Sequence, residues 1–452
     1  MTVDLVVRGA RVLTSQFMVE RAGVAVQDGK TVALAKDPHL PEASQVIDAD
    51  GKILMPGAID AHAHIYDPDY THREDWKSGS EAAAAGGVTL LMDMPLVLTV
   101  MPELARQKIE VGERESLVDF SLHAGMMTSE EHLRRMPELA EMGILSFKAF
   151  TTKPFLASYD YIEELLIRAS ELGGRIVVHS EDNQVIERGV HRVRDVEGRK
   201  DPLAHHDSRP PEAEAVAVAR IIESVARVGG HYHVAHINTA RGAELVAHAK
   251  ARGLRVTSET CVHYLVFTKD DVGRWGPYLK MTPPLRTKED VRGLWEALLT
   301  GGVDMIATDH APGTREEKEV GWDDIWEAWG GIPGVETLLP ISMSEGLHRW
   351  GIPPTVLCAA LCANPAKAFG MYPKKGELAP GSDADLVVYD QSLEVEIRAD
   401  RLHYKVGWTP YEGIVVRGWP VLVTVRGEVV AQDGEPVGRP GHGEFVRMRR
   451  WR

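Results

Sequence analysis

The stretch Gly57-Ala58-Ile59-Asp60-Ala61-His62-Ala63-His64-Ile65 combines a short apolar strand pattern with two histidines two residues apart. Side chains alternate along a β-strand, so His62 and His64 are predicted to face the same side. Two neutral imidazoles at this spacing suit zinc and similar cations. Because the chain has 19 histidines, a chance pair is an open alternative, and the pair alone does not define a metal site.

Three later apolar runs end in residues of the same kind. Residues 175–178 lead into His179, residues 232–235 into His236, and residues 303–308 into Asp309. In a βα barrel the active site is assembled at the C-terminal ends of the strands, so these side chains are predicted to meet there. Four histidines and one aspartate at successive strand ends indicate a site for two metal ions.

Each of these later residues also has a structural alternative. His179 could be held in a polar network by Glu181 or Asp182, and His236 could be a hydrogen-bonded core histidine. Asp309 could cap the helix that follows it. The joint occurrence of all these groups at strand ends favours the two-metal interpretation.

Lys148 lies in the strand pattern of residues 143–150 and is predicted to point at the same barrel mouth. Four imidazoles and one carboxylate leave two divalent cations with a single compensating charge, so a bridging anion is expected. Carbon dioxide added to the Lys148 amine would give a carbamate, which could bridge two metals about 3.5–4 Å apart. The alternative is a lysine whose head reaches solvent or pairs with a carboxylate.

The patterns on either side of this region predict the domain organisation. The first fifty residues alternate β-branched runs with turns, including the hairpin signal Gln27-Asp28-Gly29-Lys30, and β-type patterns return after Gly376. Between them, short apolar runs alternate with helical patterns such as residues 162–172, 212–228 and 240–252. We therefore predict an α/β fold: a (β/α)8 TIM-like barrel over residues 57–370, with a small β-sandwich domain formed by residues 1–56 and 371–452. Two separate α/β domains are disfavoured, because each β-rich end is too short to bury its own core.

The composition excludes several classes of partner. The chain has 452 residues, with 51 basic and 66 acidic side chains and a formal net charge of −15, which argues against nucleic-acid and anionic-membrane surfaces. Three cysteines are too few for a disulfide framework and indicate a reducing compartment. The N-terminal residues do not form an apolar signal core, and no run of 18 uncharged apolar residues occurs. A cytoplasmic protein is therefore expected.

Several ordered motifs carry a family resemblance. They are residues 60–64 (DAHAH), 82–89 (AAAAGGVT), 146–150 (SFKAF), 179–182 (HSED), 208–211 (SRPP), 259–265 (ETCVHYL), 283–286 (PPLR), 308–312 (TDHAP) and 440–443 (PGHG). Through them the chain resembles the cyclic amidohydrolases of the amidohydrolase superfamily, the group that holds dihydroorotases, allantoinases and hydantoinases. The resemblance covers nearly the whole chain.

The resemblance implies hydrolysis of a ring carbon–nitrogen bond in a cyclic amide by a binuclear metal enzyme. It implies two divalent metals, usually zinc, with His62 and His64 on the buried ion and His179 and His236 on the other. Carboxylated Lys148 would bridge them. Asp309 would complete the buried site and act as the catalytic general acid/base toward a hydroxide bridging the metals. The resemblance also implies a homotetramer or a homodimer that acts on a small-molecule cyclic amide.

The ring substrate is less closely defined. Dihydroorotases carry an arginine, an asparagine and a histidine where this chain has Tyr66, Leu96 and Gly313, so dihydroorotate is disfavoured. Allantoinases look closest over the barrel, yet Tyr66 and Val97 replace amide side chains of that subgroup, which makes an aryl or alkyl hydantoin a strong contender. We therefore predict a cyclic ureide of the allantoin or hydantoin type.

Other substrates and roles stay open as alternatives. A dihydropyrimidine or a cyclic imide comes next, then dihydroorotate; a non-catalytic scaffold is the least favoured, because all six metal positions are retained. The residues expected to contact substrate are Tyr66, Leu96, Val97, Pro283 and Gly313. The loop of residues 69–75 is either part of the substrate mouth or a solvated surface loop.

Overall fold

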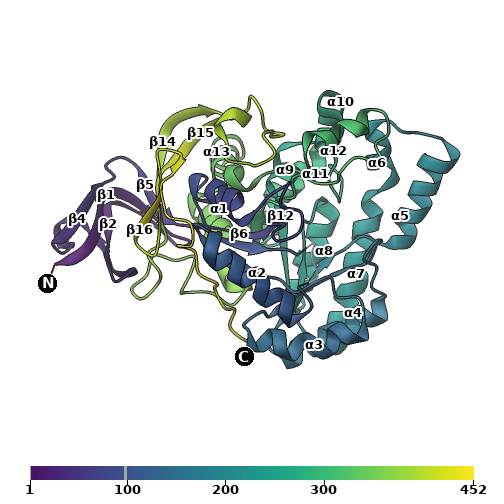
Figure 1. Cartoon of the computed structure of the whole chain (residues 1–452), viewed down its shortest axis with the longest axis horizontal. Helices are drawn as coiled ribbons and strands as arrows, with labels where there is room; N and C mark the ends of the chain where they lie inside the picture. Colours follow the sequence, from purple (N-terminus) through teal and green to yellow (C-terminus); the bar gives the residue numbers. More distant parts are fainter. Residues whose placement is uncertain (1, 96–98, 452) are drawn as a thin grey trace.

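The computed structural model describes residues 2–95 and 99–451 and has two parallel sheets at its centre, with helices packed around them (Figure 1). The three-stranded sheet contains β6 (Ala58–Ala63), β7 (Val88–Asp93) and β8 (Asp119–Leu122). The five-stranded sheet contains β9 (Ser146–Phe150), β10 (Arg175–His179), β11 (Tyr232–Val234), β12 (Val256–Cys261) and β13 (Met305–Ala307). The predicted alternation of strands and helices is confirmed.

Single parallel bridges connect the edges of the two sheets. Ala63 pairs with His310, just beyond β13, and Ala124, just beyond β8, pairs with Phe147 in β9. Because all neighbouring strands run parallel, their carboxyl ends open on the same side of the molecule.

The predicted helices are confirmed with small shifts at their ends. The pattern at 162–172 belongs to α4 (Tyr159–Glu171), that at 212–228 to α7 (Pro211–Val228), and that at 240–252 to α8 (Ala240–Ala251). Other helices around the sheets are α1 (Trp76–Ala85), α2 (Pro102–Glu115), α3 (Glu130–Glu141), α5 (Asn183–Val190), α6 (Pro202–Ser208), α11 (Lys288–Thr300), α12 (Arg315–Glu319) and α13 (Leu338–Ser344). Amphipathic α7 shows why they form, since its buried face holds Ala217, Val218 and Ile221 while most of its charged residues, such as Arg220 and Glu223, are exposed.

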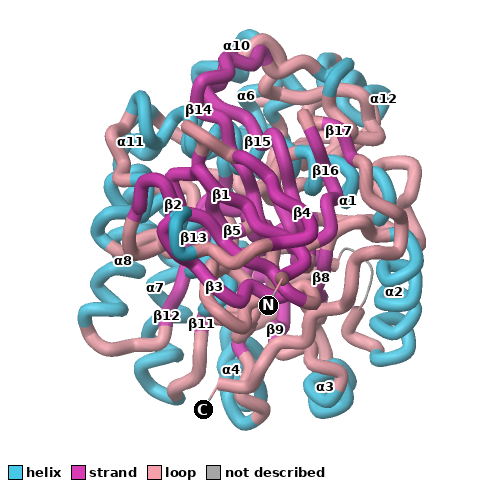
Figure 2. Tube along the Cα trace, turned by 90° about the vertical axis from the view of Figure 1, so that its left-hand side faces the viewer, coloured by secondary structure: helices cyan, strands magenta, loops and turns pink. Residues whose placement is uncertain are grey.

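Both chain ends join one nine-stranded sheet, which faces the viewer in Figure 2. Its strands are β1 (Val3–Leu13), β2 (Met18–Gln27), β3 (Lys30–Lys36), β4 (Ala43–Asp48), β5 (Ile53–Pro56), β14 (Leu386–Glu396), β15 (Val415–Val425), β16 (Glu428–Gln432) and β17 (Glu435–Pro436). The predicted hairpin is confirmed by the pairing of Gln27 with Lys30. Antiparallel pairing of β5 with β14 confirms that the two ends build one β unit.

The last residues leave this sheet and cross the amino ends of the parallel strands. The backbone amide of Val446 donates to the carbonyl of Phe120 at 2.7 Å, that of Met448 to Gly143 at 2.9 Å, and that of Trp451 to Gly173 at 2.8 Å. The C-terminal segment therefore covers the face of the sheets opposite to the carboxyl ends of the strands.

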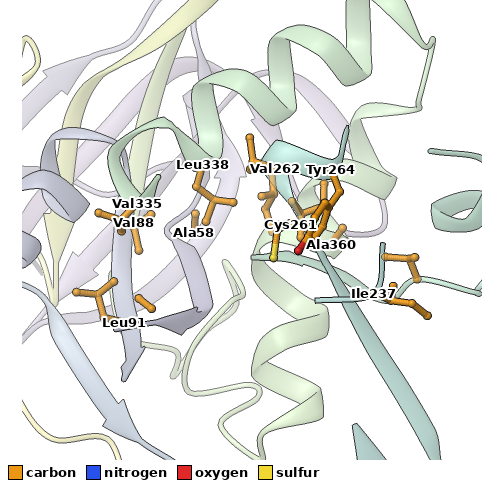
Figure 3. Packing of buried hydrophobic residues seen from close by; sticks show 14 of the residues in the cluster. Ala58, Val88, Leu91, Ile237, Cys261, Val262, Tyr264, Val335, Leu338 and Ala360 are labelled. Atoms are coloured by element: carbon orange, nitrogen blue, oxygen red, sulfur yellow. The ribbon is translucent and has the colours of Figure 1, made fainter. Parts of the chain in front are cut away.

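A large apolar core lies between the parallel strands and the helices, part of which Figure 3 shows around Cys261, Val262 and Leu338. Small residues bring the elements close together: a Cβ added at Gly86, directly after α1, would lie 2.2 Å from the carbonyl oxygen of Glu336. Such packing fixes the strands that carry the polar side chains described below. Among the described residues, no helix is both long and apolar enough to cross a membrane.

Candidate metal centre and substrate cavity

A cavity of about 660 Å³ lies at the carboxyl ends of the parallel strands. All six residues that the sequence predicted for the metals line it: His62, His64, Lys148, His179, His236 and Asp309. They come from β6, β9 and β10 and from the segments after β6, β11 and β13. The fold thus brings together side chains up to 247 positions apart in the sequence, counted from His62 to Asp309.

His62, His64 and Asp309 form the first donor group of the cavity. Oδ1 of Asp309 lies 3.2 Å from Nε2 of His62 and 3.1 Å from Nε2 of His64. Their ligand atoms are close enough together to hold one metal ion. The capping alternative for Asp309 is wrong, because Thr314 accepts the hydrogen bond at the start of α12.

His179 and His236 form the second donor group. Nδ1 of His179 lies 3.0 Å from Nε2 of His236, and the ring centroids are 4.6 Å apart. The His236 ring is also 5.3 Å from the His62 ring, so the two groups are neighbours. His236 is therefore more than an isolated core histidine.

Two buried carboxylates orient the histidines from behind. Glu181 accepts from Nε2 of His179 at 2.8 Å, and Arg209 donates to the same carboxylate at 2.5 Å. Glu259 contacts Nδ1 of His62 and accepts from Nε2 of His233 at 3.1 Å. Such contacts decide which ring nitrogen faces a metal. Sequence analysis offered Glu181 as an orienting residue but assigned no role to Glu259; its place at the start of the motif of residues 259–265 is the signal that could have identified it.

Burial sets the charge of the donor groups. It lowers the pKa of His62, and it also lowers that of His179 and His236, so these rings are neutral near pH 7. Burial alone would raise the pKa of Asp309, but the neighbouring His62 and His64 lower it to about 2. Neutral imidazoles beside an ionised carboxylate are the protonation states that metal binding needs.

Lys148 is buried among these groups, with 1% of its surface exposed. In the described part of the chain its Nζ has no hydrogen-bond partner, and burial lowers its pKa to about 8. The Lys148 head is not exposed to solvent and has no carboxylate partner among the residues that the structure describes, so both structural alternatives for Lys148 are wrong. Nδ1 of His64 and Nδ1 of His236 are likewise buried without a partner there.

The backbone is strained at two of these positions. His236 has φ 39° and Asp309 has φ 48°, both in the left-handed region that non-glycine residues rarely adopt. Such conformations cost about 1–3 kcal/mol each and cluster at functional sites, where the surrounding fold holds them.

The expected substrate contacts fall mostly outside the cavity wall. Tyr66 is buried behind His64, with its ring stacked at a centroid distance of 6.3 Å. Pro283 does not line the cavity, whereas the preceding Thr282 does. Gly313 lies behind Trp329: a Cβ there would be 2.5 Å from the indole Cδ1. Leu96 and Val97 lie outside the described residues.

Arg73 and Trp329 form a part of the wall that sequence analysis did not assign. The guanidinium carbon of Arg73 lies 3.7 Å from the centroid of the Trp329 ring, and both side chains line the cavity. Glu317 holds Arg73 through Nε at 3.0 Å and Nη2 at 2.6 Å. The loop of residues 69–75 therefore reaches the cavity mouth, and a purely solvated loop is the wrong interpretation.

A second acidic group lies away from the cavity and contains Asp119, Asp383 and Asp385. Nζ of Lys375 lies among these carboxylates, 2.8 Å from Asp383 and 2.7 Å from Asp385. Arg426 also contacts Asp119, and Lys30 contacts Asp383. These cations thus pair with the three carboxylates, and the cluster is a buried ion-pair network between the β unit and β8.

Comparison with known proteins identifies the class. Residues 53–430 match the model of the amidohydrolase family. An allantoinase of Rubrobacter xylanophilus is 38% identical, with 99% of this chain and 98% of the relative covered. An L-hydantoinase of Paenarthrobacter aurescens is 35% identical over 99% of both chains. The solved L-hydantoinase (dihydropyrimidinase) of Arthrobacter aurescens superposes with a TM-score of 0.95 at 34% identity, covering 99% of this chain and 100% of that one.

The chain therefore belongs to the amidohydrolase family. Within it, the protein is a hydrolase of cyclic amides, a cyclic ureide amidohydrolase like the allantoinases and hydantoinases to which it is similar. The likeness to the hydantoinase structures implies a TIM barrel with a β domain. These results confirm the family and the reaction class that the sequence motifs predicted.

Proposed function

We propose that the protein opens the ring of a substituted five-membered cyclic ureide, of the allantoin or hydantoin type, with two divalent metal ions in its cavity. The observation that carries this proposal is the convergence of two donor groups around a buried lysine without a partner. His62, His64 and Asp309 would hold one ion, and His179 and His236 the other. When bound, the ions would activate water and polarise a ring carbonyl.

The donor set fits such ions on structural grounds. The imidazoles of His62, His179 and His236 are neutral, the Asp309 carboxylate is ionised, and the orienting carboxylates lie behind the rings. The unpartnered Lys148 amine would be costly beside cations, and carboxylation would turn it into an anion with two oxygens. We propose that Lys148 is N6-carboxylated and bridges the metals, and that these are zinc.

Asp309 is the residue of the chain that moves the proton. Its ionised carboxylate lies at the floor of the cavity, within hydrogen-bond distance of His62 and His64. As a general base it takes a proton from the attacking water, and as a general acid it delivers that proton to the departing ring nitrogen. Asp309 has a left-handed backbone conformation and lines the cavity.

The shape of the cavity supports a substituted ring. Its volume of about 660 Å³ exceeds what a bare five-membered ring fills, and its wall combines aromatic side chains with Arg73. Allantoinases have an amide side chain where this chain has Tyr66. Arg73 would supply a polar group to the cavity in place of that amide. Dihydroorotate remains disfavoured, because Trp329 occupies the space beside Gly313 where a histidine side chain would lie.

The test is a panel assay with zinc-, manganese- or cobalt-loaded protein. Allantoin, phenylhydantoin, dihydrouracil, dihydroorotate and a simple cyclic imide are compared at matched concentrations, and we expect allantoin or phenylhydantoin to give the highest kcat/KM. Faster hydrolysis of dihydroorotate than of the others would overturn the substrate assignment. Less than one equivalent of divalent metal after mild purification, together with an unmodified Lys148 by mass spectrometry, would overturn the metal-centre assignment.

We further propose that the two parallel sheets close into one (β/α)8 barrel over residues 57–370. The bridges at Ala63 and Ala124 support this closure. Residues 1–56 and 371–452 would form the β-sandwich domain, apart from the C-terminal segment that crosses the barrel. We also propose a cytoplasmic homodimer or homotetramer; the three buried, unpaired cysteines support a reducing compartment. Gel filtration with light scattering tests the oligomeric state.

A further inference from the structure

Lys318 is completely buried in the short helix α12, beneath the cavity wall. Its ammonium group donates to three backbone carbonyls, those of Lys280, Trp329 and Gly331, each at 2.9 Å. An ammonium group has three N–H donors, so every donor of Lys318 is used. Two of the three acceptors flank Gly330, which lines the cavity, and one of them belongs to Trp329 itself.

Other contacts show that the segment of residues 325–331 is held by hydrogen bonds from neighbouring segments and not by regular secondary structure. Residues 325–331 contain no helix or strand. Lys280 donates to the carbonyls of Ile325 at 2.6 Å and Ala328 at 2.5 Å, and the amide of Trp329 donates to the carbonyl of Glu317 at 2.9 Å. A loop with few backbone hydrogen bonds of its own depends on such cross-links for its conformation.

Helix α12 also holds the opposite side of the Arg73–Trp329 stack. Glu317, the neighbour of Lys318, binds the guanidinium of Arg73 through two nitrogens. Two neighbouring residues of α12 therefore hold the two partners of the stack. Glu317 binds Arg73 through its carboxylate, and Lys318 binds the Trp329 carbonyl through its ammonium group. Burying an ammonium group without a carboxylate partner costs free energy of folding. Stability alone therefore does not account for a lysine at this position.

We propose that Lys318 is a positioning residue that holds Trp329 against Arg73 and thereby sets the selectivity of the cavity for the ring substituent. It does not line the cavity and acts through the backbone carbonyls that it binds, those of Trp329 and Gly331 together with that of Lys280. Its loss should affect large substituents and spare the bare ring, because the metal ligands lie on other elements.

The test uses Lys318→Met in the full-length, metal-loaded protein. The matched control is Lys375→Met, which also removes a buried ammonium but lies at the junction with the β unit. The measured quantity is the selectivity ratio, kcat/KM for phenylhydantoin or allantoin divided by kcat/KM for unsubstituted hydantoin. We expect this ratio to fall about tenfold or more in Lys318→Met and to stay unchanged in the control. Hydrogen exchange of residues 325–331 should also accelerate in Lys318→Met only.

An unchanged ratio in Lys318→Met, or an equal fall in both variants, would overturn the inference. If Lys318→Met does not fold, Arg73→Met tests the same stack from the cavity side, and a wild-type ratio there would overturn it as well. The kinetic readout rests on the proposed function, but the exchange readout does not. Wild-type protein that hydrolyses no cyclic ureide would refute the proposed function, while the exchange of residues 325–331 would still decide the positioning role.

Discussion

Oε2 of Glu181 lies 2.8 Å from Nε2 of His179, and this contact leaves Nδ1 of the same ring facing His236. Both side chains are buried, so the carboxylate holds one tautomer and one orientation of the ring. The low pKa of Glu181, which Arg209 and His179 lower against the effect of burial, keeps it an acceptor. The geometry of the second donor group thus depends on a residue outside the predicted ligand set.

Glu181→Gln should weaken metal binding about 10–100-fold, because an amide orients the imidazole less strongly than a carboxylate does. Competition with a chromogenic chelator measures this affinity. Glu223→Gln is the control, since Glu223 is exposed and pairs with Arg252 on the surface, away from the donor groups. Equal affinities for the Glu181 variant and wild type would show that Glu181 does not orient a ligand.

Lys148→Ala should abolish activity, because the variant has no amine to carboxylate and the bridging anion is lost. A short carboxylic acid in the buffer should restore part of the rate by replacing the carbamate. Measurement of turnover and metal content across a series of acetate and propionate concentrations checks this. A variant that keeps wild-type turnover without any added acid would contradict a bridging role for Lys148.

Asp309→Asn should retain much of the bound metal but lower kcat by about 10²–10⁴-fold, the range that general acid–base groups contribute. The amide keeps an oxygen for the ligand position but cannot accept the proton from the attacking water. Metal analysis and steady-state kinetics on the same sample separate the two effects. A rate near wild type would rule out the proton-transfer role.

Gly313→Ala should displace Trp329, since the added Cβ would lie 2.5 Å from its indole ring. Overpacking of this kind costs about 1–3 kcal/mol, so we expect a lower denaturation midpoint in urea. Gly198→Ala is a control for substitution at an open position, since no described residue other than its chain neighbours lies within 4 Å of the added Cβ, although its φ of 64° adds local backbone strain. A Gly313 variant as stable as wild type, with unchanged selectivity, would show that Trp329 moves freely.

His403→Gln should make stability less dependent on pH. The hydrogen bond to Glu336, whose Oε1 lies 3.0 Å from Nδ1, raises the pKa of His403. The stabilisation is therefore fully present below the unfolded pKa of about 6.5 and is lost as pH rises through the raised folded pKa. Thermal melts from pH 5.5 to 9 should show a Tm gap between wild type and variant that narrows at high pH; a constant gap would contradict this linkage.

Much of the architecture could be predicted from local patterns. The apolar run before His62 and the amphipathic period of α7 each report on a single element, so strand and helix types follow from spacing alone. The turn signal at Asp28-Gly29 likewise predicted the β2–β3 hairpin. The pairing of β5 with β14 was inferred only indirectly, because each chain end is too short to bury a core by itself.

The sequence by itself determined the fold class, the family and the six residues that converge on the cavity, because parallel strands bring every carboxyl end to the same side. Only the tertiary structure decided what surrounds them. It placed Tyr66 behind His64, put Trp329 in the space beside Gly313, and brought Arg73 onto that indole. These contacts join loops far apart in the chain, and loop conformation depends on packing and on buried donors such as Lys318, which no local periodicity encodes.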